Sequence, residues 1–384
     1  GESWLYPAEL DPLYDCTKDL WTGSVGYGYD NTSGEHHVSV VYDDWTRTGS
    51  YLFTSEVVDD GYIVLGTESL IVNPSHLGTD GYSSAAILSM NDNGQGLLGV
   101  DGIFAGNDPE NDVCGPPASN LTCDKVPLIK LTNNFGQSWQ GDHGAFDYYS
   151  VPENVFDDIF SNWPNTDVDP CTGEVSEIDD YWSWYEFDMR VDADGNPHIV
   201  ISIIAESENY FHFLDGYTGF YHLTIDRDNL PSPGPVGNPD NPSETGWNWS
   251  YVVEAKDTWM FTDNSASSLL TEGMASLSFD RENPDIVWVT ADLMTDYCGE
   301  LYDDGGTPDD PCDDLYDYQS ASEDIYIMKS EDGGTTWFNP YNATETPDNP
   351  EEYPADWGGS CPEGLTMCGP EETYPHAAQW STED

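Results

Sequence analysis

The chain has 384 residues, 13% of them aromatic, and carries 73 acidic against only 9 basic residues, for a formal net charge of −64. This charge disfavours nucleic acid and anionic membranes as partners. No segment approaches the ~20-residue apolar run of a membrane-spanning helix. The acidic residues alternate with Trp, Tyr and Gly throughout, which indicates a folded acidic surface. Two explanations stay open: adaptation to high salt, which the scarcity of lysine favours, and binding of divalent cations.

Short apolar segments, most of them alternating, are separated by turns rich in Gly, Asn and Asp, which predicts strands joined by tight turns. The expected strands are 36–42, 51–53, 62–65, 84–90, 126–131, 187–191, 197–201, 220–225, 249–253, 275–280, 286–291 and 324–329. Residues 151–160 carry apolar positions about four apart and predict one short helix. We expect a single domain over 1–384, with polar insertions near 141–180, 229–246, 296–318 and 339–372, the third of them a very acidic loop.

One octapeptide directly follows an expected strand and has the pattern S-x-D-x-G-x-T-W. Its defining residues are Ser330, Asp332, Gly334, Thr336 and Trp337. A degenerate copy follows the strand over 126–131, with defining residues Thr132, Asn134, Gly136 and Trp139. Carboxylate and hydroxyl groups can bond the backbone N–H groups of such a turn, glycine supplies unusual backbone angles, and the Trp covers the strands.

This pattern resembles the Asp-box (BNR) repeat of sialidase-like β-propellers, of the non-catalytic type found in bacterial and archaeal surface proteins. The resemblance implies an all-β propeller in which the turn stabilises the fold, usually away from any active site. Propeller repeats run about 40–50 residues, and the two copies lie 198 residues apart. We therefore expect six or seven blades with long loops; a β-sandwich is the alternative.

Eight cysteines occupy loop-like segments, and none forms a CxxC pair. An even number in such settings favours disulfides and an extracellular or cell-surface location. Three close pairs are expected: Cys114–Cys123, Cys298–Cys312 and Cys361–Cys368. Cys16 and Cys171 remain for a long-range link, and buried free thiols are the alternative reading.

Two acidic stretches could bind Ca²⁺, which takes six to eight oxygen ligands on flexible loops. The candidate ligands are Asp192, Asp194, Asn196, Asp303, Asp304, Asp309, Asp310 and Asp313. Neither stretch has the spacing of an EF-hand loop, and ordinary turn chemistry on an acidic surface explains them equally. No phosphate loop or nucleotide fingerprint is visible, so no organic cofactor is expected.

The resemblance also raises sialidase activity, in which three arginines of the enzyme bind the carboxylate of the substrate. The chain has only four: Arg47, Arg190, Arg227 and Arg281, none in the family's arginine motif. The sequence therefore favours a secreted or cell-surface interaction module, adhesin-like or an assembly subunit, without its own catalytic residues. Its partner would be a protein or a glycan, with self-association open. A glycoside hydrolase of sialidase-like fold and a carbohydrate-binding propeller are the alternatives.

The last apolar segment, 376–380, looks like one strand of a further blade. A propeller has to close its ring, because an open end leaves unpaired strand edges. We expect closure by an N-terminal strand such as 38–42, with a continuation of the chain or a neighbouring molecule as alternatives.

Overall fold

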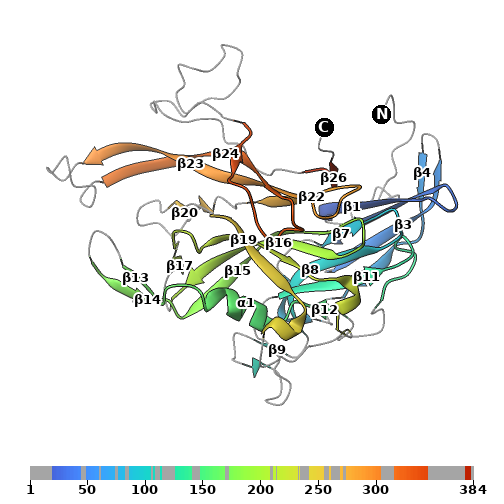
Figure 1. Ribbon diagram of the computed structural model, residues 1–384, viewed down its shortest axis with the longest axis horizontal. Coiled ribbons are helices and arrows are strands. Elements are labelled where there is room, and N and C mark those ends of the chain that lie inside the picture. The colour runs from blue at the N-terminus through green and yellow to red at the C-terminus, as the bar shows by residue number, and fades with distance from the viewer. Residues whose placement is uncertain are drawn as a thin grey trace, which may run out of the picture.

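The computed structural model contains four successive β-sheets, antiparallel except for one strand pair in the fourth, arranged side by side in a propeller-like manner (Figure 1). We call these sheets blades 1 to 4. The structure describes residues 20–44, 49–59, 62–73, 77–82, 86–104, 107–108, 113–114, 126–140, 148–168, 173–207, 211–212, 214–231, 233, 242–254, 259–260, 269–270, 274–303, 315–344 and 377–381. Within this part of the chain no helix is long and apolar enough to cross a membrane.

Blades 1 and 2 have five strands each, with every pairing antiparallel. Blade 1 contains β1 (Leu20–Asp30), β2 (Glu35–Asp44), β3 (Ser50–Asp59), β4 (Tyr62–Leu65) and β5 (Ser69–Val72). Blade 2 contains β6 (Leu77–Tyr82), β7 (Ile87–Met90), β8 (Gly96–Phe104), β11 (Val126–Thr132) and β12 (Tyr149–Ser150). A short pair, β9 (Asn107–Asp108) and β10 (Val113–Cys114), lies between β8 and β11 in the chain.

Blades 3 and 4 follow after a helix and a small hairpin, α1 (Glu153–Phe160), β13 (Thr166–Val168) and β14 (Val175–Glu177). Blade 3 contains β15 (Asp180–Val191), β16 (Pro197–Glu206), β17 (Phe211–His212), β18 (Gly219–Thr224) and β19 (Asn248–Glu254). Blade 4 contains β22 (Ala275–Asp280), β23 (Val287–Asp303), β24 (Leu315–Ser330), β25 (Tyr341–Asn342) and β26 (Trp380–Ser381). The pair β20 (Trp259–Met260) and β21 (Leu269–Leu270) precedes blade 4, and two 3-10 turns, η3 (Arg227–Asn229) and η4 (Pro242–Thr245), separate β18 from β19.

Each of the expected strands overlaps an observed one, with ends that differ by a few residues, and the expected helix over 151–160 is α1. Of the expected strand 84–90, residues 87–90 form β7, while residues 84–85 lie outside the described residues. The expectation of a loop over 296–318 is wrong where the structure describes it. Strands β23 and β24 stay paired from Val287 opposite Ser330 out to Asp303 opposite Leu315, with three register irregularities. Asp and Glu have a low intrinsic preference for strands. Here the backbone pairing between β23 and β24 continues through these residues despite that preference.

The expected number of six or seven blades is also wrong for the described residues, which form four. The two octapeptide turns lie 198 residues apart yet sit in blades 2 and 4. Each blade with its connections therefore uses roughly twice the ~40–50 residues of a common propeller repeat. Extra hairpins, α1 and long connections take up the difference.

One local turn recurs at the end of the first strand of each blade's central hairpin. The side chain of an Asp or Asn there accepts a hydrogen bond from the backbone N–H two residues later. The four residues are Asp30, Asn91, Asp192 and Asp280, with acceptor distances of 2.7, 3.0, 2.9 and 2.8 Å. This Asx turn is the structural repeat of the fold, and it reverses the chain between β1 and β2, β7 and β8, β15 and β16, and β22 and β23.

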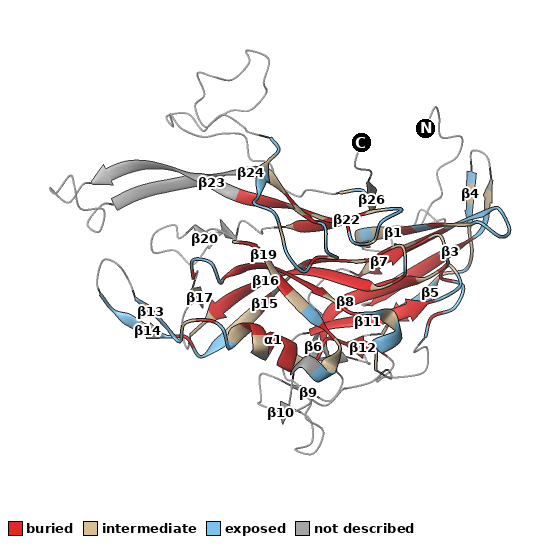
Figure 2. Cartoon of the chain, in the orientation of Figure 1, coloured by how far each residue is buried: buried red, intermediate tan, exposed pale blue. Residues whose placement is uncertain are grey.

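Two buried apolar clusters hold the blades together (Figure 2). The larger joins blades 1 to 3 and α1, and the smaller joins blades 3 and 4. Strand β16 is buried along almost its whole length. Because successive side chains alternate between the faces of a sheet, Ile199 and Ile201 enter the larger cluster while Val200 enters the smaller one. Blade 3 is thus the central layer of the core.

The first strand of blade 1 differs from its counterparts because one of its faces is open. Gly26 and Gly28 turn toward blade 2, where a Cβ atom would come within 2.9 Å of Leu88 and 2.7 Å of the Asn91 carbonyl oxygen. On the other face, Val25 is 61% exposed. Strands β7 and β22 are buried at nearly every position.

The C-terminal strand β26 pairs with blade 4, and the pairing is parallel: Trp380 lies opposite Phe279. The expected partner, Val38–Tyr42, is therefore wrong, since those residues are in β2 between β1 and β3. The preceding side chain, Gln379, donates to the backbone oxygens of Met90 and Val191 at 3.0 and 3.1 Å. One residue thereby ties β26 to blades 2, 3 and 4.

Candidate functional site: two grooves between blades

Each octapeptide turn packs against the preceding blade, and a groove lies beside each turn. In both turns the first residue's hydroxyl accepts from the glycine N–H, at 3.0 Å for Gly136 and 2.9 Å for Gly334. The Asn134 and Asp332 side chains then cap the following N–H groups. The two turns are therefore the same structure, built once with an amide and once with a carboxylate.

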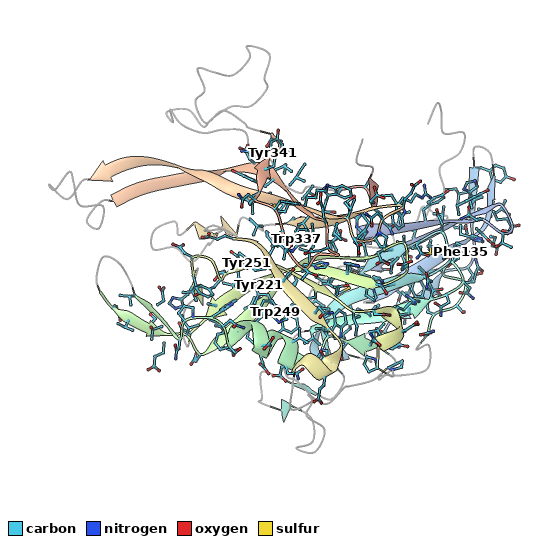
Figure 3. The ribbon with its side chains drawn as sticks, in the orientation of Figure 1. Phe135, Tyr221, Trp249, Tyr251, Trp337 and Tyr341 are labelled. Atoms are coloured by element: carbon cyan, nitrogen blue, oxygen red, sulfur yellow. The ribbon has the colours of Figure 1, made fainter. Side chains whose placement is uncertain are left out.

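The backbone at the centre of the turn is left-handed, and the two copies meet this demand differently. Gly333 has φ +70° in blade 4, where glycine carries little cost, whereas Phe135 has φ +57° in blade 2. The Phe135 ring stacks on His37 with centroids 4.3 Å apart, and it also packs against Gly94 (Figure 3). Packing against blade 1 offsets the backbone strain and fixes His37 at the edge of the first groove.

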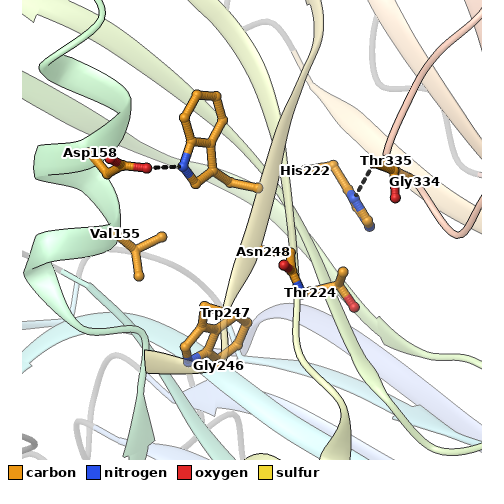
Figure 4. A pocket seen from close by; sticks show the side chains of 10 residues that line it. Val155, Asp158, His222, Thr224, Gly246, Trp247, Asn248, Gly334 and Thr335 are labelled. Carbon is orange, nitrogen blue, oxygen red and sulfur yellow. Dashed lines mark hydrogen bonds between the residues drawn. The ribbon is translucent and has the colours of Figure 1, made fainter. Parts of the chain in front are cut away.

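The groove beside the blade 4 turn, which we call the Trp249 groove, has a volume of about 520 Å³ (Figure 4). Helix α1 forms one side, β18 and β19 cross the middle, and the turn at Gly334 and Thr335 forms the other side. The indole of Trp249 donates to the Asp158 carboxylate at 2.8 Å. This bond holds a half-buried aromatic ring in a fixed position, backed by Tyr221 at 6.0 Å between centroids (Figure 3).

The donors on the blade 4 side of this groove are already used within the protein. The indole of Trp337 donates to the Ser250 hydroxyl at 2.9 Å, and that hydroxyl donates to the Gly334 carbonyl at 2.5 Å. The Trp249 groove thus offers ring surface and exposed polar groups such as Asn248 and Thr335. Trp247 also lines this groove, and its buried indole N–H has no acceptor among the described residues.

The groove beside the blade 2 turn, which we call the Trp139 groove, is larger, at about 1020 Å³. It lies between β2, β3 and β5 of blade 1 and residues 136–139. Thr54 donates to the Gly136 carbonyl at 3.2 Å, as Ser250 does to Gly334. The indole N–H of Trp139 nevertheless has no acceptor among the described residues, although this side chain is 7% exposed.

A buried polar chain lies beneath the blade 4 turn. Because the Gly334 carbonyl can only accept, His222 donates to it from Nδ1, at 3.2 Å. The His222 Nε2 then accepts from His198 Nδ1 at 2.8 Å, and His198 Nε2 faces Asp192 at 3.4 Å. The chain links the Asx turn of blade 3 to the octapeptide turn of blade 4.

The ionisation of this chain follows from its burial. Complete burial lowers the pKa of His222 well below its ordinary value, and the neighbouring His198 lowers it further. Burial alone would raise the pKa of Asp192, but hydrogen bonds from His198 and Asn196 outweigh that effect and the pKa lies below its ordinary value. In this row of hydrogen-bonded groups, the lowered pKa values favour the neutral form of His222 and the ionised form of Asp192.

The three described arginines bind to different parts of the fold. Arg190, on β15, donates to Asp188 at 2.7 Å and to Ser276 at 2.9 Å. Arg227 donates to backbone oxygens of Gly195 and Thr132 at 3.1 and 2.6 Å, and Arg281 pairs with Asp92. Each serves a separate inter-blade contact, and Arg47 lies outside the described residues.

The predicted metal ligands fall into two groups. Asp192, Asp194 and Asn196 are together in the Asx turn of blade 3, where Asp192 accepts from Asn196 N and Nδ2 at 2.8 and 2.9 Å. Asp303 ends β23, and Asp304, Asp309, Asp310 and Asp313 lie outside the described residues. No group of three or more potential metal ligands occurs in the part of the chain that is described. Calcium binding stays a prediction.

The predicted disulfides also stay predictions. Cys114 lies in β10 and Cys298 in β23. The remaining six fall outside the described residues: Cys16, Cys123, Cys171, Cys312, Cys361 and Cys368.

Sequence reasoning missed both grooves and the buried histidine chain. The two histidines are 24 residues apart, and their partner Gly334 is a further 112 residues along. Only the pairing of β16 with β18, which sets His198 opposite Thr224 and His222 opposite Val200, brings them together. The one usable signal was the pair of matched turns, each ending in a tryptophan.

Comparisons with known proteins identify no family. No protein-family model matches the chain, and no curated protein matches it. Four chains of solved structures match. One is the Hadza microbial sialidase Hz136, with 12% sequence identity and a TM-score of 0.26. The match covers 83% of this chain but 58% of that chain, so this chain spans less than two thirds of that sialidase. At this level the similarity carries no argument about activity.

Proposed function

We propose that this chain is an extracellular or cell-surface interaction module that binds a partner without transforming it. The observation that carries the proposal concerns Arg190, whose guanidinium is already bound within the protein instead of being offered to a substrate carboxylate. It is a described arginine on the first strand of a blade's central hairpin, and its guanidinium is held by Asp188 while Ser276 bridges the two. Asp188 also accepts from the Leu277 N–H at 2.8 Å. An arginine neutralised in this way tightens blade 3 against blade 4.

The surface charge sets the class of partner. At a net charge of −64, long-range repulsion disfavours anionic ligands, including sialylated glycans. Neutral glycans and proteins with a basic surface remain. Salt screens both the self-repulsion and the attraction to basic partners, so binding to a neutral partner is the mode that persists in concentrated salt.

A second candidate function, carbohydrate binding, is favoured by one specific observation. Trp249 presents a half-buried ring fixed by Asp158 in a groove that also exposes Asn248 and Thr335. An aromatic face beside amide, hydroxyl and carboxylate groups matches a sugar, which has an apolar C–H face and a polar rim.

Two measurements on the purified chain test the proposal. Fluorogenic glycosides, both neutral and sialylated, should give no turnover above a heat-denatured control, and an array of neutral and sialylated glycans should show retention of neutral ones only. Turnover of any glycoside that is lost on Asp188→Asn substitution would contradict the non-catalytic function and favour a glycosidase. Retention of sialylated glycans would contradict the electrostatic argument.

A further inference from the structure

Three polar side chains meet at one end of blade 3, apart from both grooves, and we call them the Ser207 triad. The Ser207 Oγ atom lies 2.9 Å from His212 Nε2, and His212 Nδ1 lies 2.9 Å from Asp167 Oδ2. Ser207 directly follows β16, His212 lies in β17 and Asp167 lies in β13, at the same end of the molecule (Figure 1). A hydroxyl, an imidazole and a carboxylate bonded in this order are a nucleophile, its base and the group that orients the base.

Strand pairing places the hydroxyl beside the imidazole. Ala205 of β16 lies opposite His212 of β17. Side chains two residues apart along a strand point to the same face, and diagonal neighbours across a strand pair are within reach of each other. Ser207 is two residues beyond Ala205, so it is the diagonal neighbour of His212 on the same face.

The hairpin β13–β14 brings the carboxylate, and two contacts attach this hairpin to blade 3. Ile178, directly after β14, is buried in the larger apolar cluster. The Asp179 N–H donates to the backbone oxygen of Glu206 at 3.3 Å. Glu206 directly precedes Ser207, so the hairpin that carries Asp167 is fastened next to the nucleophile.

The hydrogen bonds determine which way the imidazole faces. An ionised carboxylate only accepts, so the proton between His212 and Asp167 belongs to His212 Nδ1. In the neutral ring Nε2 is then an acceptor, and the Ser207 hydroxyl donates to it. The His212 side chain is only 10% exposed, so water competes little for these bonds. This is the tautomer in which a histidine can take the proton of an attacking hydroxyl.

The surroundings of the triad favour a neutral substrate. Glu177 lies opposite Thr166 in the hairpin, and Asp180 lies opposite Glu206 in blade 3. Strands β13, β14 and β17 contain no Lys or Arg. An anionic acyl group would therefore meet carboxylates without a cation from these strands. Ser207 is partly exposed, so a small neutral molecule can reach its hydroxyl from solvent.

We propose that Ser207 is the nucleophile of an esterase site for small neutral carboxylic esters, with His212 as general base and Asp167 as the positioning residue. The Ser207 oxygen bonds to the ester carbonyl carbon while His212 takes its proton. The ester C–O bond then breaks, and the alcohol leaves with that proton. Water next attacks the acyl carbon and gives a proton to His212, which returns it to Ser207 as the carboxylic acid leaves.

This site goes beyond the proposed function, because it acts on a second, small molecule and leaves the bound partner intact. None of the three residues lines either groove. The glycan array that tests partner binding therefore does not depend on Ser207, and Ser207→Ala should retain the same glycans as the unsubstituted chain.

A neutral alkyl fluorophosphonate tests the nucleophile directly, because the Ser207 oxygen displaces fluoride from phosphorus and its proton passes to His212. We expect one adduct per chain by intact mass, mapped to Ser207 and absent from Ser207→Ala. Ser161→Ala is the matched control, since that exposed hydroxyl donates to the Asp158 backbone oxygen, and it should be labelled normally. The chain should also hydrolyse p-nitrophenyl acetate faster than the anionic p-nitrophenyl hemisuccinate, and the reverse order would contradict a neutral substrate.

Variants of the other two residues separate catalysis from a structural role. His212→Gln should slow labelling by ~100-fold or more. Asp167→Asn should slow it by ~tenfold or more, because an amide can donate to Nδ1 and leave Nε2 protonated, whereas Asp167→Glu should keep part of the rate. Melting temperatures confirm that each variant is folded. The proposal is overturned if no adduct forms, if the adduct maps to another residue, or if folded His212→Gln and Asp167→Asn are labelled at the unsubstituted rate.

Discussion

The Asp332 carboxylate should be the most sensitive exposed group in the blade 4 turn. Its Oδ1 accepts from the N–H groups of Thr335 and Thr336 at 3.1 and 2.8 Å and from the Ser330 hydroxyl at 2.8 Å, and its Oδ2 accepts from the Thr336 hydroxyl at 2.6 Å. Burial would raise the Asp332 pKa, but these bonds outweigh it and lower the pKa below its ordinary value. Asp332→Ala removes both acceptor oxygens and so all four hydrogen bonds at once.

The expected loss is about 1–3 kcal/mol in the free energy of unfolding. Four bonds at ~0.5–1.5 kcal/mol each would give more, but Asp332 is exposed, so water replaces part of each bond. Urea denaturation followed by tryptophan fluorescence, in salt, measures the change. Glu331→Ala is the matched control, because that exposed side chain bonds only Lys329 among the described residues and exposed pairs contribute little. A loss for Asp332→Ala within 0.5 kcal/mol of the control would refute the reasoning.

Three further outcomes are expected. Because the pKa of buried His222 is lowered, the unfolded chain takes up a proton near pH 6.5 that the folded protein does not. The free energy of unfolding should therefore fall as pH drops below ~6.5, by up to ~1.4 kcal/mol per pH unit, and His222→Asn but not His36→Asn should flatten that slope. The melting temperature should rise with NaCl. A larger rise with CaCl₂ at equal ionic strength, reversed by a chelator, would show specific calcium sites. A melting temperature that responds to none of NaCl, CaCl₂ and chelator would contradict both explanations of the acidic surface. Peptide mapping without reduction should find Cys114–Cys123, Cys298–Cys312 and Cys361–Cys368 bridged, and free thiols there would exclude the disulfides.

Local signals predicted the elements of this fold well because each strand carries its own pattern. The segment 275–280 matches β22 at both ends, and the Asx turns at Asn91 and Asp192 follow directly from Asn and Asp beside glycine. The number of blades could not be predicted in the same way. It depends on how many residues each connection uses, and the hairpin β23–β24 uses far more than a common repeat.

The candidate site was the least predictable part, because it arises from packing between blades. Nothing near Trp139 in the sequence separates it from Trp337, since both end the same turn. The difference comes from the preceding blade: Ser250 in blade 3 reaches the Trp337 indole, while Thr54 in blade 1 bonds Gly136 but not the Trp139 indole. The sequence alone does not indicate which blade a turn will pack against.

The hydrogen bonds of Gln379 have a consequence for how the chain folds. They join positions separated by 289 and 188 residues in sequence, among the most distant contacts in the molecule. Folding slows as native contacts become more distant along the chain, because loop-closure entropy is lost before the contacts form. During synthesis, blades 1 to 3 emerge well before Gln379 and Trp380. The residue that ties these blades together is therefore made well after Met90 and Val191, the residues it bonds, and these three positions can be joined only once it has been synthesised.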